Sequence, residues 1–243
     1  MNWKLMMNVS KLVMVSTAIL ILSAQIVLAQ DFTVQMANEE GKIIATRYIS
    51  QHAVRIVSTY PADSDIIYRM ETGKIISINN KEKTYGEITA AELRQRMEQK
   101  ESSLSPQQKE LMQHFGMSSG ATTLTKIGPG ETIAGYATDK YSVKGPTMQG
   151  EIWVAPALEV PPGYYDMVTS MAVSQLGGTS TILKQLKEKQ VKGYLLKMTG
   201  SASAMPMMKG VTFTQVAKSV EKHPIAASTF EPPAGYQKVA RPQ

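Results

Sequence analysis

Short segments of alternating apolar and polar residues, separated by turns, constrain the fold of this chain more than any other feature. Asn38 to Gly41 reads as a turn, and Pro61 ends a segment because proline cannot donate to a strand ladder. Strands of this length at this spacing predict a curved sheet of sandwich or barrel type. Since the connections are too short for parallel pairing, we expect an antiparallel order. The predicted strands are 32–36, 43–50, 53–60, 65–70, 75–79 and 84–86.

Helical segments interrupt the strands from Thr89 onward. A capping box from Thr89 to Glu92 predicts a helix to about residue 100, and Ser105-Pro106 predicts another that ends at Gly116. Because their apolar faces are narrow, we expect these helices to pack on the sheet rather than to form a bundle of their own. Further strands are predicted at 132–143 (interrupted at Gly135), 151–155, 193–198 and 210–221, and further helices after Gly163 and from Thr179.

These elements together predict an α+β fold class. A large sheet must bury at least one face, and a sheet that curls around helices does so within a single domain. We therefore expect a strongly curved antiparallel sheet, an unclosed barrel, with inserted helices covering its concave face.

The first 29 residues have the pattern of a secretory signal peptide. Lys4 and Lys11 precede an uncharged apolar run that ends at Ala29, a small residue suited to cleavage. We therefore expect residues 30–243 to form one mature domain that is periplasmic or secreted. The alternative is an uncleaved N-terminal helix that anchors the protein, because the run is long enough to span a bilayer.

Composition excludes several classes of chemistry. The chain contains no cysteine, so it has no disulfides, thiolate catalysis, cysteine–zinc sites or iron–sulfur clusters. Cleavage of the signal peptide would remove Lys4 and Lys11 from the 26 basic residues. The mature chain would then have 24 basic and 20 acidic residues, a net charge of +4. These scattered charges do not predict a nucleic-acid partner, although they allow a transient contact with an anionic membrane surface. The sequence makes no prediction of the oligomeric state.

The sequence contains no arrangement typical of an enzyme. The three histidines, His52, His114 and His223, lack a catalytic or metal-binding spacing. No Gly-x-Ser-x-Gly turn presents a nucleophile, and the acidic residues fall mostly in turns and on polar helix faces. We therefore expect no catalysis, no cofactor and no conventional metal site.

A methionine-rich segment offers one alternative. Met205, Met207 and Met208 can bind Cu(I) together with His114 or Met117, because thioethers suit that ion. The competing interpretation is an apolar loop that folds over the sheet.

An apolar constellation is the main candidate site. If the alternation holds along each strand, one side of the sheet carries aromatic and aliphatic side chains, and a covering helix adds methionines. Such a set can line a cavity for a hydrophobic ligand, or it can form an ordinary closed core. The candidate cavity residues are Tyr48, Ile56, Tyr68, Met70, Ile78, Trp153, Met167, Met171 and Phe213.

Several segments together carry a family resemblance. They are the strand pattern of residues 46–78, Ile133-Ala-Gly-Tyr136, Asp139-Lys-Tyr141, Glu151-Ile-Trp-Val154 and the ending Phe230-Glu-Pro-Pro-Ala-Gly-Tyr236. Over roughly residues 32–239 the chain thereby resembles the DUF4412 type of exported bacterial domain. Members of that type often have cysteine where this chain has Thr138, so any role of that cysteine is absent here.

More distantly, the order of elements resembles the lipoprotein-carrier superfamily of LolA, LolB and mycobacterial lipid-binding lipoproteins. That resemblance implies an unclosed antiparallel barrel with helices over an apolar cavity, which binds acyl chains or lipoproteins without turnover. It also implies that the carriers' arginine on an early strand corresponds to Arg47 or Arg55. We therefore expect a periplasmic protein that binds a lipid or lipidated protein in an apolar cavity. The alternatives are a structural or partner-binding envelope module with a filled core, and methionine-based copper binding.

Overall fold

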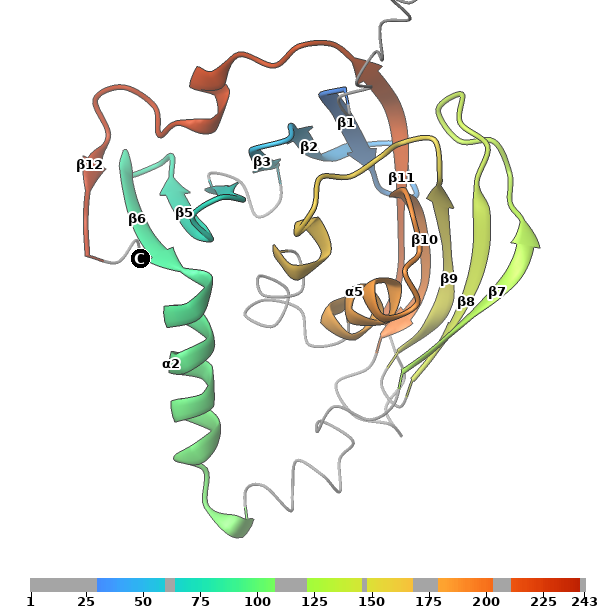
Figure 1. The fold of residues 1–243 in the computed structure, drawn as a ribbon, viewed down its shortest axis with the longest axis horizontal. Coiled ribbons are helices and arrows are strands. Elements are labelled where there is room, and N and C mark those ends of the chain that lie inside the picture. Colours follow the sequence, from blue (N-terminus) through green and yellow to red (C-terminus); the bar gives the residue numbers. More distant parts are fainter. Residues whose placement is uncertain are drawn as a thin grey trace, which may run out of the picture.

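The computed structural model describes residues 30–59, 64–107, 122–145, 148–167, 179–202 and 211–240. Within these ranges, the strands form one strongly curved sheet (Figure 1). No helix within them is long and apolar enough to cross a membrane. The predicted signal peptide, most of the second predicted helix and the methionine-rich segment lie outside the described residues.

The first six strands are consecutive hairpins, as the alternating pattern predicts. Each pairs antiparallel with the next one along the chain. Two of the turns contain glycine at positive φ, Gly41 (φ 79°) and Gly73 (φ 61°), a conformation that glycine adopts without strain. The strands are β1 (Phe32–Ala37), β2 (Ile43–Ile49), β3 (Ala53–Ser58), β4 (Ser64–Arg69), β5 (Lys74–Asn79) and β6 (Thr84–Thr89).

The later strands extend the sheet beyond β1 rather than beyond β6. They are β7 (Thr123–Pro129), β8 (Asp139–Lys144), β9 (Met148–Ala155), β10 (Tyr194–Ala202), β11 (Val211–Lys222) and β12 (Gln237–Lys238). The strand order is β12-β6-β5-β4-β3-β2-β1-β11-β10-β9-β8-β7, so β1 and β11 meet inside the sheet. All neighbours are antiparallel except β12, which runs parallel to β6. Because β7 and β12 are the two edges, the sheet is unclosed.

The segment before β8 differs from the sequence prediction. One strand is predicted at 132–143, but a tight turn between Ile133 and Tyr136 precedes β8. Ala134 (φ 48°) and Gly135 (φ 84°) have positive φ in that turn, which is incompatible with a continuous strand. The alternation did not predict β7, because this edge strand buries Leu124 alone.

Helix α2 (Ala90–Ser102) begins at the predicted capping box. The Thr89 backbone N–H donates to Glu92 Oε2 (2.7 Å), and the Glu92 backbone N–H donates to Thr89 Oγ1 (3.1 Å). Ala90 and Leu93 pack against the core, whereas the other described side chains of α2 are exposed. The helix therefore contacts the sheet through its first turn.

Helix α5 (Thr179–Glu188) lies inside the curve of the sheet (Figure 1). Its residues Ile182 and Leu186 are buried against the strands. A separate helical turn at residues 164–167 buries Tyr164 and Met167. We call the face of the sheet on this side the concave face and the opposite face the convex face.

The sheet buries apolar side chains on both faces. We call three groups of packed residues the Tyr194 cluster, the α5 cluster and the convex cluster. The Tyr194 cluster includes Phe32, Val34, Ile49, Val54, Tyr68, Ile75, Tyr164, Met167 and Tyr194. The α5 cluster includes Leu124, Tyr141, Val143, Ile152, Val154, Ile182, Leu186 and Met198. The convex cluster comprises Ala53, Ile67, Ile76, Ile78 and Phe230, the last of which comes from the 3-10 helix η2 (Ala227–Phe230).

Candidate ligand-binding site

The ladder registers of β1–β6 define which side chains share the concave face. Arg47 stands directly opposite Val34 on β1 and Ile56 on β3. Residues that stand opposite one another project from the same side of a sheet. Arg47 is the sole charged residue on this face of β1–β6. The others are Phe32, Val34, Met36, Ala45, Ile49, Val54, Ile56, Ser58, Ile66, Tyr68, Ile75, Ser77, Asn79, Thr84, Gly86 and Ile88.

Arg47 is held by a tyrosine from the distant strand β10. Its Nη1 donates a hydrogen bond to the Tyr194 hydroxyl at 3.2 Å. The Tyr194 ring contacts Phe32 edge-on (5.3 Å between ring centroids) and Tyr164 at a tilt (5.8 Å). The buried Nε of Arg47 has no hydrogen-bond partner, and Arg47 has no ion pair, within the described part of the chain.

The electrostatics of this group favour a charged guanidinium beside neutral phenols. Burial lowers the pKa of Arg47, but the neighbouring Tyr194 and Tyr164 raise it by more, so the pKa lies above its ordinary value. Burial raises the pKa of Tyr164 well above its ordinary value and also raises the pKa of Tyr165. Arg47 is therefore a cation at neutral pH.

Arg55 lies on the opposite face and has a different environment. It stands opposite Tyr48 and Ile67, both on the convex face. Its Nη2 donates to Asp65 Oδ2 at 2.5 Å, and its Nη1 donates to the Thr229 carbonyl at 3.0 Å. Arg55 therefore ties the C-terminal segment to the sheet, which leaves Arg47 as the arginine that faces the concave side.

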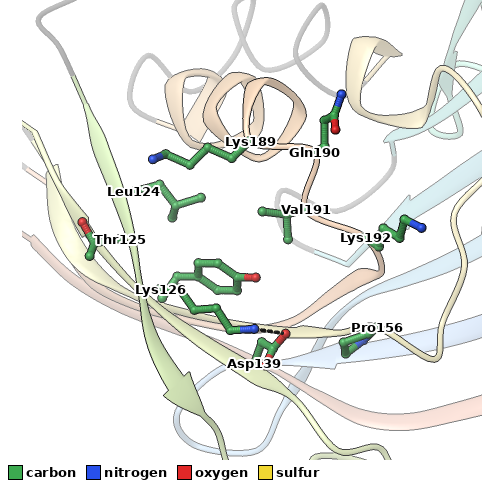
Figure 2. Close-up of a pocket in the computed structure, with 10 residues that line it drawn as sticks. Leu124, Thr125, Lys126, Asp139, Pro156, Lys189, Gln190, Val191 and Lys192 are labelled. Atoms are coloured by element: carbon green, nitrogen blue, oxygen red, sulfur yellow. Dashed lines mark hydrogen bonds and ion pairs between the residues drawn. The ribbon is translucent and has the colours of Figure 1, made fainter.

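A pocket of about 440 Å³ opens between the β7–β8 edge and the connection from α5 to β10 (Figure 2). Leu124 and Val191 lie across it from one another, and Tyr141 also lines it. Leu124 and Tyr141 belong to the α5 cluster, and Val191 packs against that cluster. The pocket is therefore a place where the apolar concave side meets solvent.

Charged groups surround the apolar part of this pocket. Lys126 Nζ and Asp139 Oδ2 form an ion pair at 2.8 Å within the lining (Figure 2). The exposed Lys189 and Lys192 belong to the lining on the α5–β10 side. Burial, followed by the charge of Asp139, raises the pKa of Tyr141, so its hydroxyl is protonated at neutral pH. An apolar wall with a few polar groups suits a small amphipathic ligand.

The structure brings together part of the predicted cavity set. Ile56 and Tyr68 lie on the concave face, and Met70 packs against the same cluster. Met167 is fully buried in the Tyr194 cluster, and Phe213 packs against the α5 cluster.

The prediction of a single face is wrong for two other members of the set. Tyr48 and Ile78 lie on the convex face, because Tyr48 stands opposite Arg55 and Ile78 stands opposite Asp65. Trp153 is buried and packs within the Tyr194 cluster, although it projects away from its neighbour Ile152, which packs with α5. Alternation does not distinguish the faces here, since both faces of the sheet are apolar.

Some predicted residues cannot be compared with the structure. Met171, the last member of the set, lies outside the described residues, and so do all the proposed copper ligands. Within the described part of the chain, no group of three His, Asp or Glu side chains is placed to hold a metal ion. None of the eight predicted cavity residues that the structure describes lines the pocket of Figure 2.

The sequence analysis missed the pocket, and it named Arg47 only as one of two candidates for the carriers' arginine. A signal for Arg47 was present, because Ala45, Arg47 and Ile49 share one face of an otherwise apolar strand. The pocket wall contributed by residues 189–192 has no such signal, since it follows a helix and belongs to an irregular connection.

Comparisons with known proteins place the chain in a family. The model of the family described as "Domain of unknown function (DUF4412)" matches residues 31–236. The chain belongs to the DUF4412 family. A comparison with curated proteins finds no match.

Two solved structures of PNGF-II, in the C2 and P21 space groups, resemble this DUF4412 chain. Their sequence identities are 14% and 13%, and their TM-scores are 0.43 and 0.42. The matches cover 86% and 87% of the DUF4412 chain but only 30% and 32% of the PNGF-II chains. The chain thus spans about a third of the length of those proteins.

Proposed function

We propose that this DUF4412 protein is exported by its N-terminal segment and binds a hydrophobic ligand, a lipid or lipidated protein, on its concave side without chemical turnover. Partly open apolar positions on the concave face carry this proposal. Ile56, Ile66 and Ile88 on β3, β4 and β6 are half-buried there, whereas Phe32, Val34 and Ile49 on β1 and β2 are buried. Apolar surface that is left partly open on one side favours a ligand-binding role.

The pocket beside α5 supports the same proposal. Its volume of about 440 Å³ lies within the range of roughly 300–1,000 Å³ that is typical of small-molecule sites. Its apolar wall is continuous with the α5 cluster, so a ligand that enters there contacts the concave side.

The helices supply a movable cover in this proposal. Ala90 and Leu93 are the described side chains through which α2 packs on the core, and elements with few buried contacts open at low free-energy cost. Ligand entry and release would then follow movement of the helices. This arrangement is also what the more distant similarity to the lipoprotein carriers implies.

Binding can be tested directly. Native mass spectrometry of gently purified full-length protein should detect a co-purified lipid, and a fluorescent fatty acid should bind and be displaced by an unlabelled one. Protein that carries no lipid and does not bind the fluorescent fatty acid would contradict the proposal. That result would favour a partner-binding envelope module.

Two substitutions on one strand provide a matched test of the binding face. Ile88 is half-buried on the concave face of β6, and Tyr85 is half-buried on the convex face of the same strand. We expect Ile88→Gln to weaken fatty-acid binding several-fold and Tyr85→Gln to leave it unchanged in the folded protein. Equal effects of the two substitutions would exclude the concave face as the site.

A further inference from the structure

Arg47 is a charged residue within an apolar surface. On the concave face of β1–β6 it has no charged neighbour, and Val34 and Ile56 stand on either side of it. The acceptor of its hydrogen bond is the hydroxyl of Tyr194 rather than a carboxylate. The positive charge is therefore not balanced within the described part of the chain.

An unbalanced charge in such surroundings is costly. Removing a charged group from water without an opposite charge is strongly unfavourable, so buried charges are normally paired. Arg55 illustrates the normal arrangement in the same sheet, because it pairs with the buried Asp65. Arg47, which is half-buried, has no such carboxylate within the described part of the chain, so it can accept an anionic partner.

The chemistry of the guanidinium specifies that partner. Its planar donors match a carboxylate or a phosphate group, to which they form short, charge-assisted hydrogen bonds. The side chains around Arg47 on the same face are aliphatic and aromatic, which suits a hydrocarbon chain.

We propose that the ligand of the concave side is an anionic amphiphile, whose carboxylate or phosphate head binds Arg47 while its hydrocarbon chain lies on the surrounding apolar residues. This inference rests on the proposed function, which it narrows from hydrophobic ligands in general to anionic ones. Tyr194 orients the guanidinium through its hydroxyl. Lys192 lines the pocket, and Tyr194 lies two residues later, at the start of β10. The proposed anion site at Arg47 and the pocket are therefore connected through this segment.

The test compares ligands that share a chain length and differ in the head group. Isothermal titration calorimetry of the full-length protein at pH 8 would measure binding of decanoate, decyl phosphate and decanol. We expect both anions to bind about 10-fold to 100-fold more tightly than decanol, which is the effect of a hydrogen bond to a charged group.

Substitutions then test whether Arg47 causes the preference for anionic ligands. Arg47→Met should lower the affinities of decanoate and decyl phosphate to that of decanol, and Arg47→Lys should retain a reduced preference for the anions. Arg69→Met is the matched control, since Arg69 lies on the convex face in an ion pair with Glu231 and its loss should leave the preference intact. Arg47→Met should also fold, because it replaces an unbalanced charge with an apolar side chain of similar length.

The outcomes separate this inference from the proposed function. Equal binding of all three ligands by the unmodified protein would overturn the anion site but leave hydrophobic binding in place. Binding of none of them would overturn both. A preference for anions that persists in folded Arg47→Met would also overturn the inference, and it would assign the preference to other cations, such as Lys189 and Lys192 at the pocket.

Discussion

Arg47 on β2 and Tyr194 on β10 are joined by a hydrogen bond of 3.2 Å, although 147 residues separate them in the sequence. Three strands, β1, β11 and β10, follow β2 in the sheet order, so the bond reaches across the concave side rather than along one ladder. It thereby links the N-terminal meander to the half of the sheet that carries α5.

We expect Tyr194→Phe to destabilise the protein by about 1–3 kcal/mol, because it leaves the Arg47 guanidinium without its acceptor. The free energy of unfolding in urea would measure this change. Tyr141→Phe is the control, since the Tyr141 ring is also buried but its hydroxyl belongs to the pocket. If both substitutions have the same small effect, the hydrogen bond does not stabilise the fold.

Asp65→Asn should be more damaging than any substitution in an exposed ion pair. The Asp65 side chain is 3% exposed, accepts from Arg55 Nη2 at 2.5 Å and accepts from Asn80 Nδ2 at 3.0 Å. Breaking a buried pair of this kind costs about 3–5 kcal/mol. Glu71→Gln provides the comparison, because its partner His52 is 78% exposed and a surface pair contributes about 0–1 kcal/mol. If the two variants unfold at similar urea concentrations, this interpretation of the Arg55–Asp65 pair is wrong.

Gly150→Ala should disrupt the pairing of β9 with β10. Gly150 stands opposite Gly200, and a Cβ at Gly150 would lie 2.1 Å from the Thr199 carbonyl oxygen. Because that neighbour is backbone, the strands must separate, and we expect a loss of about 1–3 kcal/mol in thermal or urea unfolding. Gln149→Ala, at the exposed adjacent position, should change stability by less than about 0.5 kcal/mol. Wild-type stability in Gly150→Ala would show that the strands accommodate the methyl group.

The attachment of β12 to β6 should weaken in acid. The hydrogen bond from Lys238 lowers the pKa of Glu87 below its ordinary value of 4.5, burial opposes this shift, and Lys74 adds to it. Since the pKa is lower in the folded state, the stabilisation is present above the unfolded-state value and is lost as the pH falls through the folded-state value. The protection of the Val239 amide, which donates to the Tyr85 carbonyl, should therefore fall below about pH 4.5.

Glu87→Gln provides the control for this acid effect. The variant should show weak protection of the Val239 amide at neutral pH, with no further loss in acid beyond that of a distant reference amide. An unchanged acid dependence in the variant would assign the effect to another carboxylate.

Local patterns in the sequence predicted the order of β1–β6 and the start of α2. Turns such as the one at Gly73 connect strands whose partners are their immediate neighbours, so alternation and turn residues are sufficient. The Thr89–Glu92 capping box is equally local. The resemblance to the DUF4412 family is also confirmed.

The choice of face could not be predicted in the same way. Tyr48 and Arg47 are adjacent, and an apolar aromatic residue is the natural candidate for an inward position. The convex face is also covered, however, because η2 inserts Phe230 beside Ile67 and Ile76. When a distant segment buries the second face, period-two alternation no longer distinguishes inward from outward positions.

Pairing of β1 with β11 has a consequence for how the protein matures. Phe32 stands beside Lys222, so a strand made at the start of synthesis finds its second neighbour only near the end. Until then the nascent meander presents an open backbone edge at β1, which other chains can join. We therefore expect truncation before residue 211, which removes β11, to yield aggregates rather than a smaller stable domain.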